Sequence, residues 1–425
     1  MATRIRLTRR ESNNTPLPYT ASPLYLFWSD ICLAIQYAWA LPWIVLPLRL
    51  GRTSSLDELH LSLQGAISVI TQLFLAVFQL LFLLCLPILA FVPIPVPWAL
   101  AFIAVSLTFN YTVTMLILNG FQRVLESKAP VIEQPWHQKE RWLYINGVAN
   151  GHFWVQNNID QLSYTFGRKI LGIHNRTGGI LFDLVECLIQ RGFSYATGDI
   201  RRAYVLIKGA LLDSSVEKVV LVLHSQGGIE GGLIIDWLLD ELPQDLLHQL
   251  EVYTFGNAAN HFNNPLRSCR ASGLSGLSTR RSISYIEHYA NSNDPVSWLG
   301  ILRFASIPNR YLGRLFVRPG SGHLMNQHYL DNMFTLGPDK RVLDSNPFMD
   351  MTVDVPLALI SQNVRGLSRA TGTLNEPAEE DLFPVPTPAT ALQNGKVQNG
   401  QGDEELHVKD FSRLWQYRNG GSPDR

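Results

Sequence analysis

Residues 219–228 read Val219-Val-Leu-Val-Leu-His-Ser-Gln-Gly-Gly228, and the expected architecture can be worked out from this stretch. An apolar, β-branched run enters a serine flanked by small residues, and a segment of helical length and periodicity, 227–239, follows it. The pattern predicts a strand, a tight turn and a helix, with the Ser225 hydroxyl exposed on the turn and the Gln226 N–H directed at a reacting carbonyl oxygen. Leu223 stands where the usual Gly-x-Ser-x-Gly motif has its first glycine, and an ordinary strand-to-helix connection fits the same pattern.

Strands and helices alternate on both sides of this motif. Apolar runs typical of buried strands occupy 142–146, 170–174, 218–223, 251–255, 282–289 and 314–318, and helical patterns occupy 179–191, 200–212 and 227–239. Alternation of this kind predicts an α/β fold, a mostly parallel sheet with helices on both faces. We place this catalytic domain at residues 140–345.

Two loops after predicted strands complete a possible catalytic set. Asp294 follows the strand at 282–289, just before a proline, where a carboxylate can orient a histidine. His323 follows the strand at 314–318 in a glycine-bearing loop. Its imidazole can take a proton from a serine and return it to a leaving group. Serine, acid and histidine thus occur in this order along the chain.

Other residues compete for these roles. His328 is a second candidate for the base, and Asp331 follows it in a helical stretch. Asp199 precedes the serine, so the chain order disfavours it as the acid. We expect His224 to be structural support, because a turn of this kind directs adjacent side chains apart.

An oxyanion site needs a second backbone N–H besides that of Gln226. The loop after the strand at 142–146 contains Gly147 and Val148, and either N–H can serve. A simple strand-to-helix turn is the alternative interpretation of this loop.

Five motifs taken together resemble an α/β-hydrolase of the lipase and serine-esterase type. They are Tyr-Ile-Asn-Gly (144–147), Leu-His-Ser-Gln-Gly (223–227), Val-Tyr-Thr-Phe-Gly-Asn (252–257), Asn-Asp-Pro-Val (293–296) and Gly-His (322–323). The resemblance covers about residues 140–337. It implies a catalytic triad of Ser225, Asp294 and His323 and ester hydrolysis without a cofactor.

The N-terminal third is too apolar for the surface of a soluble domain, since no charged residue occurs between Leu59 and Gln122. After a polar basic segment, 1–23, we predict a membrane region over 24–130. Residues 66–92 and 98–118 each have the ~20 residues that a bilayer requires, and a proline-rich break separates them. They predict a transmembrane hairpin; a buried two-helix core of a soluble protein is the alternative.

Residues 24–48 contain Asp30, two prolines and several aromatic residues, a composition that fits an interfacial helix or a third span. Basic residues flank the hairpin on its outer ends, and its tip has none; those residues are Arg49, Arg52, Arg123 and Lys128. By the positive-inside rule, this distribution predicts an integral membrane protein whose catalytic domain faces the cytoplasm.

Composition excludes other classes. The 35 basic and 35 acidic residues give a formal net charge of zero, whereas nucleic-acid binding needs a basic excess. The four cysteines, Cys32, Cys85, Cys187 and Cys269, lack zinc-site spacing, so we expect no structural metal and no disulfide scaffold.

Two segments are expected to be irregular. Residues 258–281 are rich in glycine and serine and fit either a lid over the site or a mobile surface loop. Residues 368–425 are polar and predict a disordered tail, in which the amphipathic stretch 405–415 either docks or frays.

The sequence therefore predicts a membrane-anchored serine hydrolase whose partners are a membrane and a lipid or other apolar ester. Acyl transfer by the same residues is an alternative, as is a catalytically silent scaffold that binds a lipid or a protein. A transporter is disfavoured, because the spans are few and show no paired polar residues.

Overall fold

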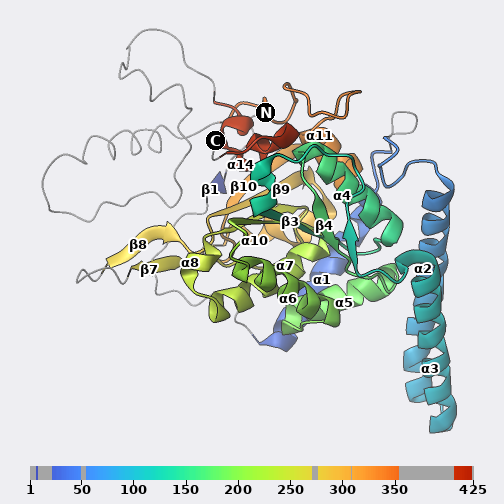
Figure 1. Ribbon diagram of the computed structural model, residues 1–425. Helices are drawn as coiled ribbons and strands as arrows, with labels where there is room; N and C mark the ends of the chain where they lie inside the picture. The colour runs from blue at the N-terminus through green and yellow to red at the C-terminus, as the bar shows by residue number, and fades with distance from the viewer. Residues whose placement is uncertain are drawn as a thin grey trace, which may run out of the picture.

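A central sheet organises the globular part of the chain. The computed structural model describes residues 6–7, 22–48, 54–269, 276–307, 309–353 and 406–423. Eight strands form the sheet in the order β1-β10-β9-β6-β5-β3-β4-β2 (Figure 1). The six inner strands run parallel, whereas β1 and β2 pair antiparallel at the two edges.

The strands follow the apolar runs of the sequence closely. Their bounds are β1 (Arg6–Leu7), β2 (Val124–Glu126), β3 (Glu140–Ile145), β4 (Ile170–Ile173), β5 (Lys218–His224), β6 (Leu250–Phe255), β7 (Leu266–Cys269), β8 (Gly276–Arg281), β9 (Tyr285–Asn293) and β10 (Arg314–Ser321). Strands β7 and β8 pair with each other in a separate hairpin.

Helices precede, separate and follow these strands. The N-terminal ones are α1 (Pro23–Tyr37), η1 (Ala38–Ile44), α2 (Leu63–Phe91), α3 (Val96–Val113) and η2 (Thr114–Asn119). Those of the domain are η3 (Pro135–Lys139), α4 (His152–Phe166), α5 (Ile180–Phe193), α6 (Gly198–Leu212), α7 (Gln226–Glu241), α8 (Gln244–Leu247), α9 (Pro295–Leu299), α10 (Ile301–Phe304), η4 (Met325–Leu330) and α11 (Asp331–Met333). Near the C-terminus lie α13 (Val408–Phe411), α14 (Arg413–Gln416) and η5 (Arg418–Gly420).

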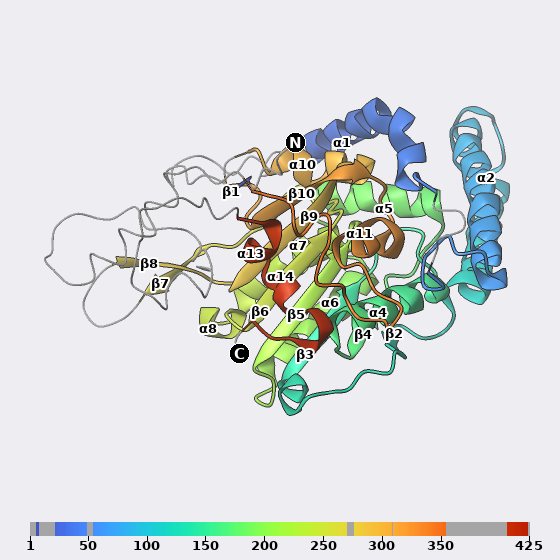
Figure 2. The ribbon, with the colours of Figure 1, turned by 90° about the horizontal axis from the view of Figure 1, so that it is seen from above.

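Both faces of the sheet are covered by helices (Figure 2). Leu221 and Leu223 of β5 pack into a core with α6 and α7, whereas Val220 and Val222 pack into a second core with α4, η4 and the C-terminal helices. Successive residues of a strand point to opposite faces, which explains why residues 219–223 of β5 are all apolar. The predicted α/β class, a mostly parallel sheet between two helical layers, is confirmed. Helix α4 was not predicted, because its buried side includes polar residues such as Gln156 and Asn158 and so lacks a clear apolar periodicity.

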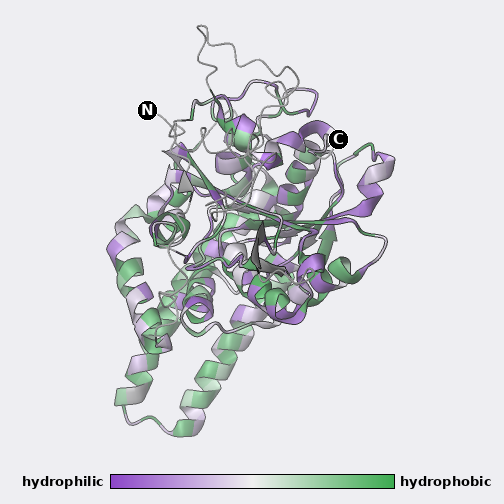
Figure 3. Ribbon diagram, turned by 90° about the vertical axis from the view of Figure 1, so that its left-hand side faces the viewer, coloured by the Kyte–Doolittle hydropathy of each residue, from purple (hydrophilic) through white to green (hydrophobic). Residues whose placement is uncertain are grey.

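In the described part of the chain, three helical segments are long and apolar enough to cross a membrane: Pro23–Ile44, Leu63–Leu89 and Val96–Asn119. Helices α2 and α3 form the predicted hairpin, and its apolar end projects beyond the domain (Figure 3). One expectation about them is wrong, because polar residues do pair between the two helices. Gln79 Nε2 donates a hydrogen bond to Asn110 Oδ1 over 2.8 Å, and both side chains also contact the domain.

The first apolar block is attached to the domain. Helix α1 packs against α5 and α9, and η1 packs against α9. Arg191 of α5 donates to the Asp30 carboxylate over 2.9 Å, and both side chains are buried. Tyr37, Trp39 and Trp43 gather around the Trp298 ring of α9.

The expectation of a disordered tail over 368–425 is wrong for residues 406–423. Phe411, Leu414, Trp415 and Tyr417 are buried in the second core. Arg413 donates to Glu251 of β6 over 3.0 Å. Residues 368–405 lie outside the described part of the chain. The docked segment, which was expected to be frayed, covers apolar surface that this side of the sheet would otherwise expose.

Strands β7 and β8, which belong to residues 258–281, do not form a lid over the site. Strands β7 and β8 lie close to α8, near the ends at which β6 and β9 begin (Figure 1). Consistent with this place, Ser284 contacts His248, the residue that follows α8. The serine turn lies at the opposite ends of the strands, so this hairpin does not cover it.

We expect Trp415→Ala to lower the free energy of unfolding by about 3–5 kcal/mol, because it removes a large buried side chain from the second core. Leu343→Ala is the control, since Leu343 is an exposed hydrophobic residue and its loss should change little. Chemical unfolding of the detergent-solubilised protein, followed by near-ultraviolet circular dichroism, measures both. Equal stabilities for the two variants would mean that the C-terminal segment does not hold this face.

Candidate active site

Ser225 lies on the turn between β5 and α7. Its backbone has φ of +57° and ψ of −120°, a conformation that residues other than glycine rarely adopt. Such strain persists only where the surroundings enforce it. The Ser225 N–H donates to Phe255 O, and the Ser225 carbonyl accepts from Gly228 N and Ala258 N. These bonds fix the turn from the neighbouring strand, the helix and the following loop.

Glycines allow the neighbouring backbones to approach this turn. A Cβ at Gly147 would lie 2.4 Å from Ser225 Cβ, and one at Gly227 would lie 2.4 Å from Ile145 O. Leu223 stands at the place of the usual first glycine, and its side chain packs against Gly231 of α7. A Cβ at Gly231 would lie 2.2 Å from Leu223 Cδ1. The steric clearance that the motif normally obtains from its first glycine is therefore provided by Gly231.

The strand order places this turn at a topological switch point. The chain passes from β3 outward to β4, and then returns to β5 on the other side of β3. Loops that leave adjacent strands in opposite directions open a crevice at their carboxyl ends, where α/β proteins bind ligands. Gly147 after β3 and Ser225 after β5 lie on the two sides of this crevice.

Asp294 and His323 form a buried pair beside the turn. His323 Nδ1 donates to Asp294 Oδ2 over 2.8 Å. The same carboxylate accepts from the hydroxyls of Tyr329 (2.6 Å) and Ser297 (2.9 Å) and from the Val296 N–H (2.9 Å). Burial opposes ionisation of Asp294, but the His323 ring and these donors outweigh it and lower its pKa below the usual value. The carboxylate is thus charged and fully hydrogen-bonded.

The other ring nitrogen of His323 is available. Nε2 is buried and has no hydrogen-bond partner among the described residues, and Ser225 and His323 are only 2% and 4% exposed. No hydrogen bond joins Nε2 to the Ser225 hydroxyl in this structure; catalytic hydrogen bonds often tighten only once substrate is bound. His224 holds the histidine loop, because its Nε2 donates to His323 O over 2.8 Å and the two rings stack with centroids 4.8 Å apart. Burial lowers the pKa of His224 to about 3, so its ring is neutral.

Three backbone N–H groups lie on the serine turn or on the loop whose Gly147 approaches it. Gln226 opens α7, where the first N–H groups have no partner within the helix. The N–H groups of Gly147 and Val148 likewise have no acceptor among the residues that the structure describes. The helix dipole adds a partial positive charge at Gln226. This corner of the crevice suits a negatively charged oxygen.

A buried amide network, missed by the sequence interpretation, holds these donors. Asn146 Nδ2 donates to the carbonyl groups of Gly147 and Asn175, and Asn175 N donates back to Asn146 Oδ1. Asn175 Nδ2 donates to the Gln226 side chain over 3.0 Å. Asn146 directly follows β3, and Asn175 lies two residues after the end of β4. A polar residue at the end of a parallel strand is the sequence signal that could have identified them.

Asp183 of α5, also missed, fixes the far end of the loop that contains Gly147 and Val148. Its carboxylate accepts from Ala149 N (2.8 Å), Thr177 Oγ1 (2.6 Å) and Gly178 N (2.7 Å). Burial raises its pKa to about 6. Nothing in the local sequence of a helical aspartate indicates this contact.

The rival residues have other roles. His328 Nδ1 accepts from Leu324 N, and its Nε2 contacts the Pro47 carbonyl, so it shapes the loop around His323 instead of contacting Asp294. Asp331 accepts from Gln161, and Asp199 pairs with Arg123 and Arg202. Neither acid pairs with His323. Within the described ranges, no group of three or more His, Cys, Asp or Glu side chains could hold a metal ion.

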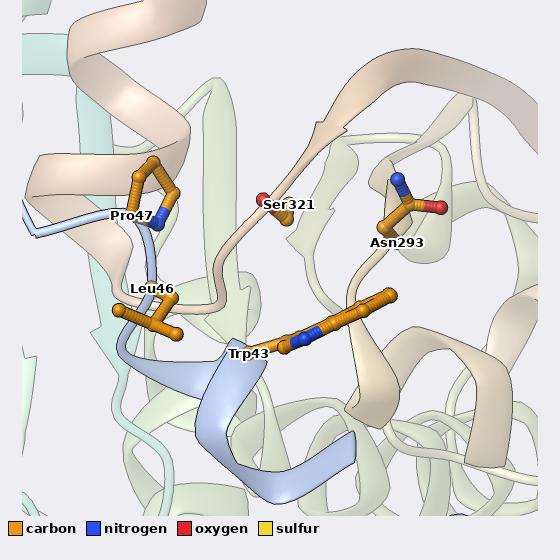
Figure 4. A pocket seen from close by; sticks show the side chains of 5 residues that line it. All are labelled: Trp43, Leu46, Pro47, Asn293 and Ser321. Atoms are coloured by element: carbon orange, nitrogen blue, oxygen red, sulfur yellow. The ribbon is translucent and has the colours of Figure 1, made fainter.

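A pocket of about 410 Å³ lies between the N-terminal segment and the loops that carry Asp294 and His323. Trp43, Leu46 and Pro47 line one side, and Asn293 and Ser321 line the other (Figure 4). The Ile44 carbonyl accepts from His323 N over 2.9 Å. The segment after α1 therefore contacts the candidate active site directly, which the sequence did not indicate.

No protein-family model matches the chain, and no curated protein is similar to it. The function of this site has to be inferred from its geometry and chemistry. The arrangement joins a strained serine, a histidine with one free nitrogen, a charged carboxylate and three unpaired N–H groups. Those are the parts that nucleophilic acyl transfer requires.

Glu230, one turn into α7, is almost fully buried, and its Oε1 atom has no partner among the described residues. Burial, together with the neighbouring charge of Glu186, raises the pKa of Glu230 well above its usual value. Above the usual glutamate pKa, Glu230 keeps its proton in the native state and loses it in the unfolded chain, so its contribution to the free energy of unfolding should fall as the pH rises from about 5 to 8. We expect Glu230→Gln to be more stable than wild type at pH 8, by about 1 kcal/mol or more, and to depend less on pH.

Urea unfolding of the solubilised protein at pH 5, 6, 7 and 8 measures this dependence. Glu241→Gln is the matched control, because Glu241 lies at the exposed end of the same helix and pairs with Lys208. A Glu230→Gln stability profile that parallels the wild-type profile over this pH range would contradict a protonated buried Glu230.

Proposed function

We propose that this protein is a membrane-associated serine hydrolase that cleaves an acyl ester of a lipid or another apolar substrate. The observation that carries the proposal is the Asp294–His323 pair beside a serine held at φ +57°. Assignment of the domain to the α/β-hydrolase fold belongs to the same proposal. It is supported by a serine that follows the inner strand β5 and by an acid and a histidine that follow the parallel strands β9 and β10, beyond β6 in the sheet, in that chain order.

The reaction proceeds in two halves. Ser225 Oγ attacks the ester carbonyl carbon while His323 Nε2 takes the hydroxyl proton. Ionised Asp294 stabilises the resulting imidazolium, and the N–H groups of Gln226 and of Gly147 or Val148 receive the negative oxygen. His323 then gives its proton to the departing alcohol, leaving an acyl-serine. Water, deprotonated by His323, attacks the acyl group and restores the free serine with release of the acid.

The surroundings support an apolar substrate. The pocket beside the pair has an apolar side formed by Trp43, Leu46 and Pro47, and these residues extend from an apolar N-terminal segment. Helix α2, which is long and apolar enough to enter a membrane, is joined to the domain near the same site, where Gln72 bonds Ala149 O. Pocket and membrane attachment together favour a lipid ester over a water-soluble one.

Labelling with a fluorophosphonate probe tests the central claim. We expect the full-length protein in membranes to be labelled, and both Ser225→Ala and His323→Ala to lose labelling, because the probe reacts only with an activated serine. Ser306→Ala is the control, since Ser306 lies on an exposed loop and bonds only Arg303 O. Failure of a folded wild-type protein to react would remove the hydrolase proposal and favour the scaffold interpretation.

A second test addresses the oxyanion site. We expect Gly147→Ala to slow probe labelling by roughly 10²–10³-fold, the usual cost of a disturbed oxyanion donor, because the new methyl group would collide with Ser225. Gly209→Ala should leave the rate unchanged and stabilise the protein by up to about 1 kcal/mol, since Gly209 lies in α6 with open space around it. Equal labelling rates for the two alanine variants would show that Gly147 does not shape the site.

A further inference from the structure

We propose that the protein is held in a single phospholipid leaflet and that none of its helices crosses the bilayer. Helix α1, the outer side of α5 and the end of the α2–α3 hairpin form one apolar surface, called here the leaflet surface, which enters the membrane from the side of the domain. The inference concerns the mode of attachment, and it stands whether or not Ser225 is a nucleophile.

Helix α1 belongs to the domain and cannot also span the bilayer. Its Asp30 is buried against Arg191 of α5, and a Cβ at Gly192 would lie 3.0 Å from Phe27 Cβ, so the two helices are in close contact. Moving α1 into the hydrocarbon would leave a carboxylate and a guanidinium unpaired, at a cost of several kcal/mol. The opposite side of α1 is apolar and exposed, and it presents Leu24, Tyr25, Trp28 and Ile35. Aromatic residues of this kind are typical of helices that lie in the interface.

The outer side of α5 continues this surface. Leu184, Val185 and Phe193 are exposed. The charged residues of α5 are engaged on the inner side, where Asp183 accepts from Ala149 N and Arg191 pairs with Asp30. Glu186 likewise accepts from Gln190 and Gln226. A helix that exposes apolar groups and directs its charges inward is suited to contact lipid rather than water.

The hairpin is joined to the domain over much of its length. Gln72 donates to Ala149 O, and Gln79 accepts from the first N–H groups of α5, those of Leu181 and Phe182. Asn110 donates to Gly178 O, and Asn119 exchanges two bonds with Thr177. These amides lie in helices that were expected to contact lipid, and each of them makes at least one hydrogen bond to the domain. The side of α2 that carries Gln72 and Gln79 is therefore packed on protein, whereas Leu73 and Val77 on its other side are exposed.

The free end of the hairpin is too short to cross a bilayer. The last ring contact between α2 and the domain is Phe82 on Phe182, with centroids 5.9 Å apart, and Phe82 also stacks on Phe102 of α3. Beyond Phe82, α2 continues only to Phe91. At a rise of 1.5 Å per residue, that is about 14 Å. The hydrocarbon core of a bilayer is about 30 Å thick, so the free end reaches roughly its middle.

The tip has the chemistry of a segment that stays in hydrocarbon. Phe91 is 88% exposed and Trp98 is 72% exposed, with Val92 and Val96 also exposed between them. The connection contains no charged residue. A crossing hairpin would place these side chains in water on the far side, whereas a hairpin that ends mid-bilayer buries them. The leaflet surface also adjoins the Trp43–Pro47 side of the pocket, so an acyl chain can approach the site from the same leaflet.

Thiol accessibility of the tip provides the test. Ile94→Cys is made in the full-length chain with the native cysteines replaced by alanine, reconstituted in sealed phosphatidylcholine vesicles, and exposed to a membrane-impermeant maleimide on both sides. We expect no reaction until detergent is added. Ser306→Cys, on the exposed loop of the domain, should react at once. Reaction of Ile94→Cys in intact vesicles at a rate similar to that of Ser306→Cys would overturn the proposal, because only a crossing hairpin delivers the tip to water.

A second measurement uses the unmodified protein. Triolein droplets coated with a phosphatidylcholine monolayer offer one leaflet only, and we expect wild type to bind them about as well as it binds vesicles. A spanning hairpin would be excluded from the droplets, and that result would also refute the proposal. Leu184→Glu should weaken binding by roughly tenfold by removing apolar surface from the leaflet. Leu343→Glu, similarly exposed at 45% against 40%, should not change binding.

Discussion

The close approach of the loop after β3 to the turn after β5 is the constraint on which the rest of the site depends. The strand order reverses between these two strands, so their loops diverge and leave a crevice. Only glycine at 147 and 227 allows the two backbones to meet there without collision. Once they meet, the strained Ser225, the start of α7 and the N–H groups of Gly147 and Val148 share one corner. Asp294 and His323 lie beside this corner because they follow β9 and β10, which run parallel to β5.

The same loop connects the site to the membrane hairpin. Ala149, two residues after Gly147, donates its N–H to Asp183 and accepts a hydrogen bond from Gln72 of α2. Asp183 in turn holds Thr177 and Gly178, the residues that contact Asn110 and Asn119. Hydrogen bonds therefore connect the hairpin and α5 to Ala149, the residue that follows Gly147 and Val148. A displacement of the hairpin from the domain would break the contact of Gln72 with Ala149 in the Gly147 loop.

Much of the fold, and which residues it brings together beside the serine turn, could be predicted from local sequence. Strands and helices have distinct periodicities, and polar residues that follow parallel strands gather at one edge, which is why Ser225, Asp294 and His323 could be named. The contacts that could not be predicted depend on distant segments. Gly231 makes room for Leu223, Arg191 makes Asp30 a buried residue, and Arg413 reaches Glu251. No window of sequence shows which remote partner satisfies such a group, so a docked C-terminal segment resembles a disordered one and an attached helix resembles a span.

Burial of the Glu186 and Glu230 carboxyl groups near Gln226 would favour the proposed reaction at a cost to stability. Burial raises the pKa of Glu186 to about 7 and that of Glu230 well above its usual value. Protonated, these groups leave the positive field at the start of α7 unopposed, and a negative oxygen at the Gln226 N–H is stabilised. Ionised, they would place negative charge behind the same donor and oppose that oxygen. Replacing Glu230 with an apolar residue would avoid the penalty, yet it would remove a polar group that the Gln190 side chain contacts. A neutral carboxyl satisfies the network without opposing the charge that the proposed reaction would develop, so loss of the proposed activity and loss of the stability that this pair contributes should occur together as the pH rises through its titration.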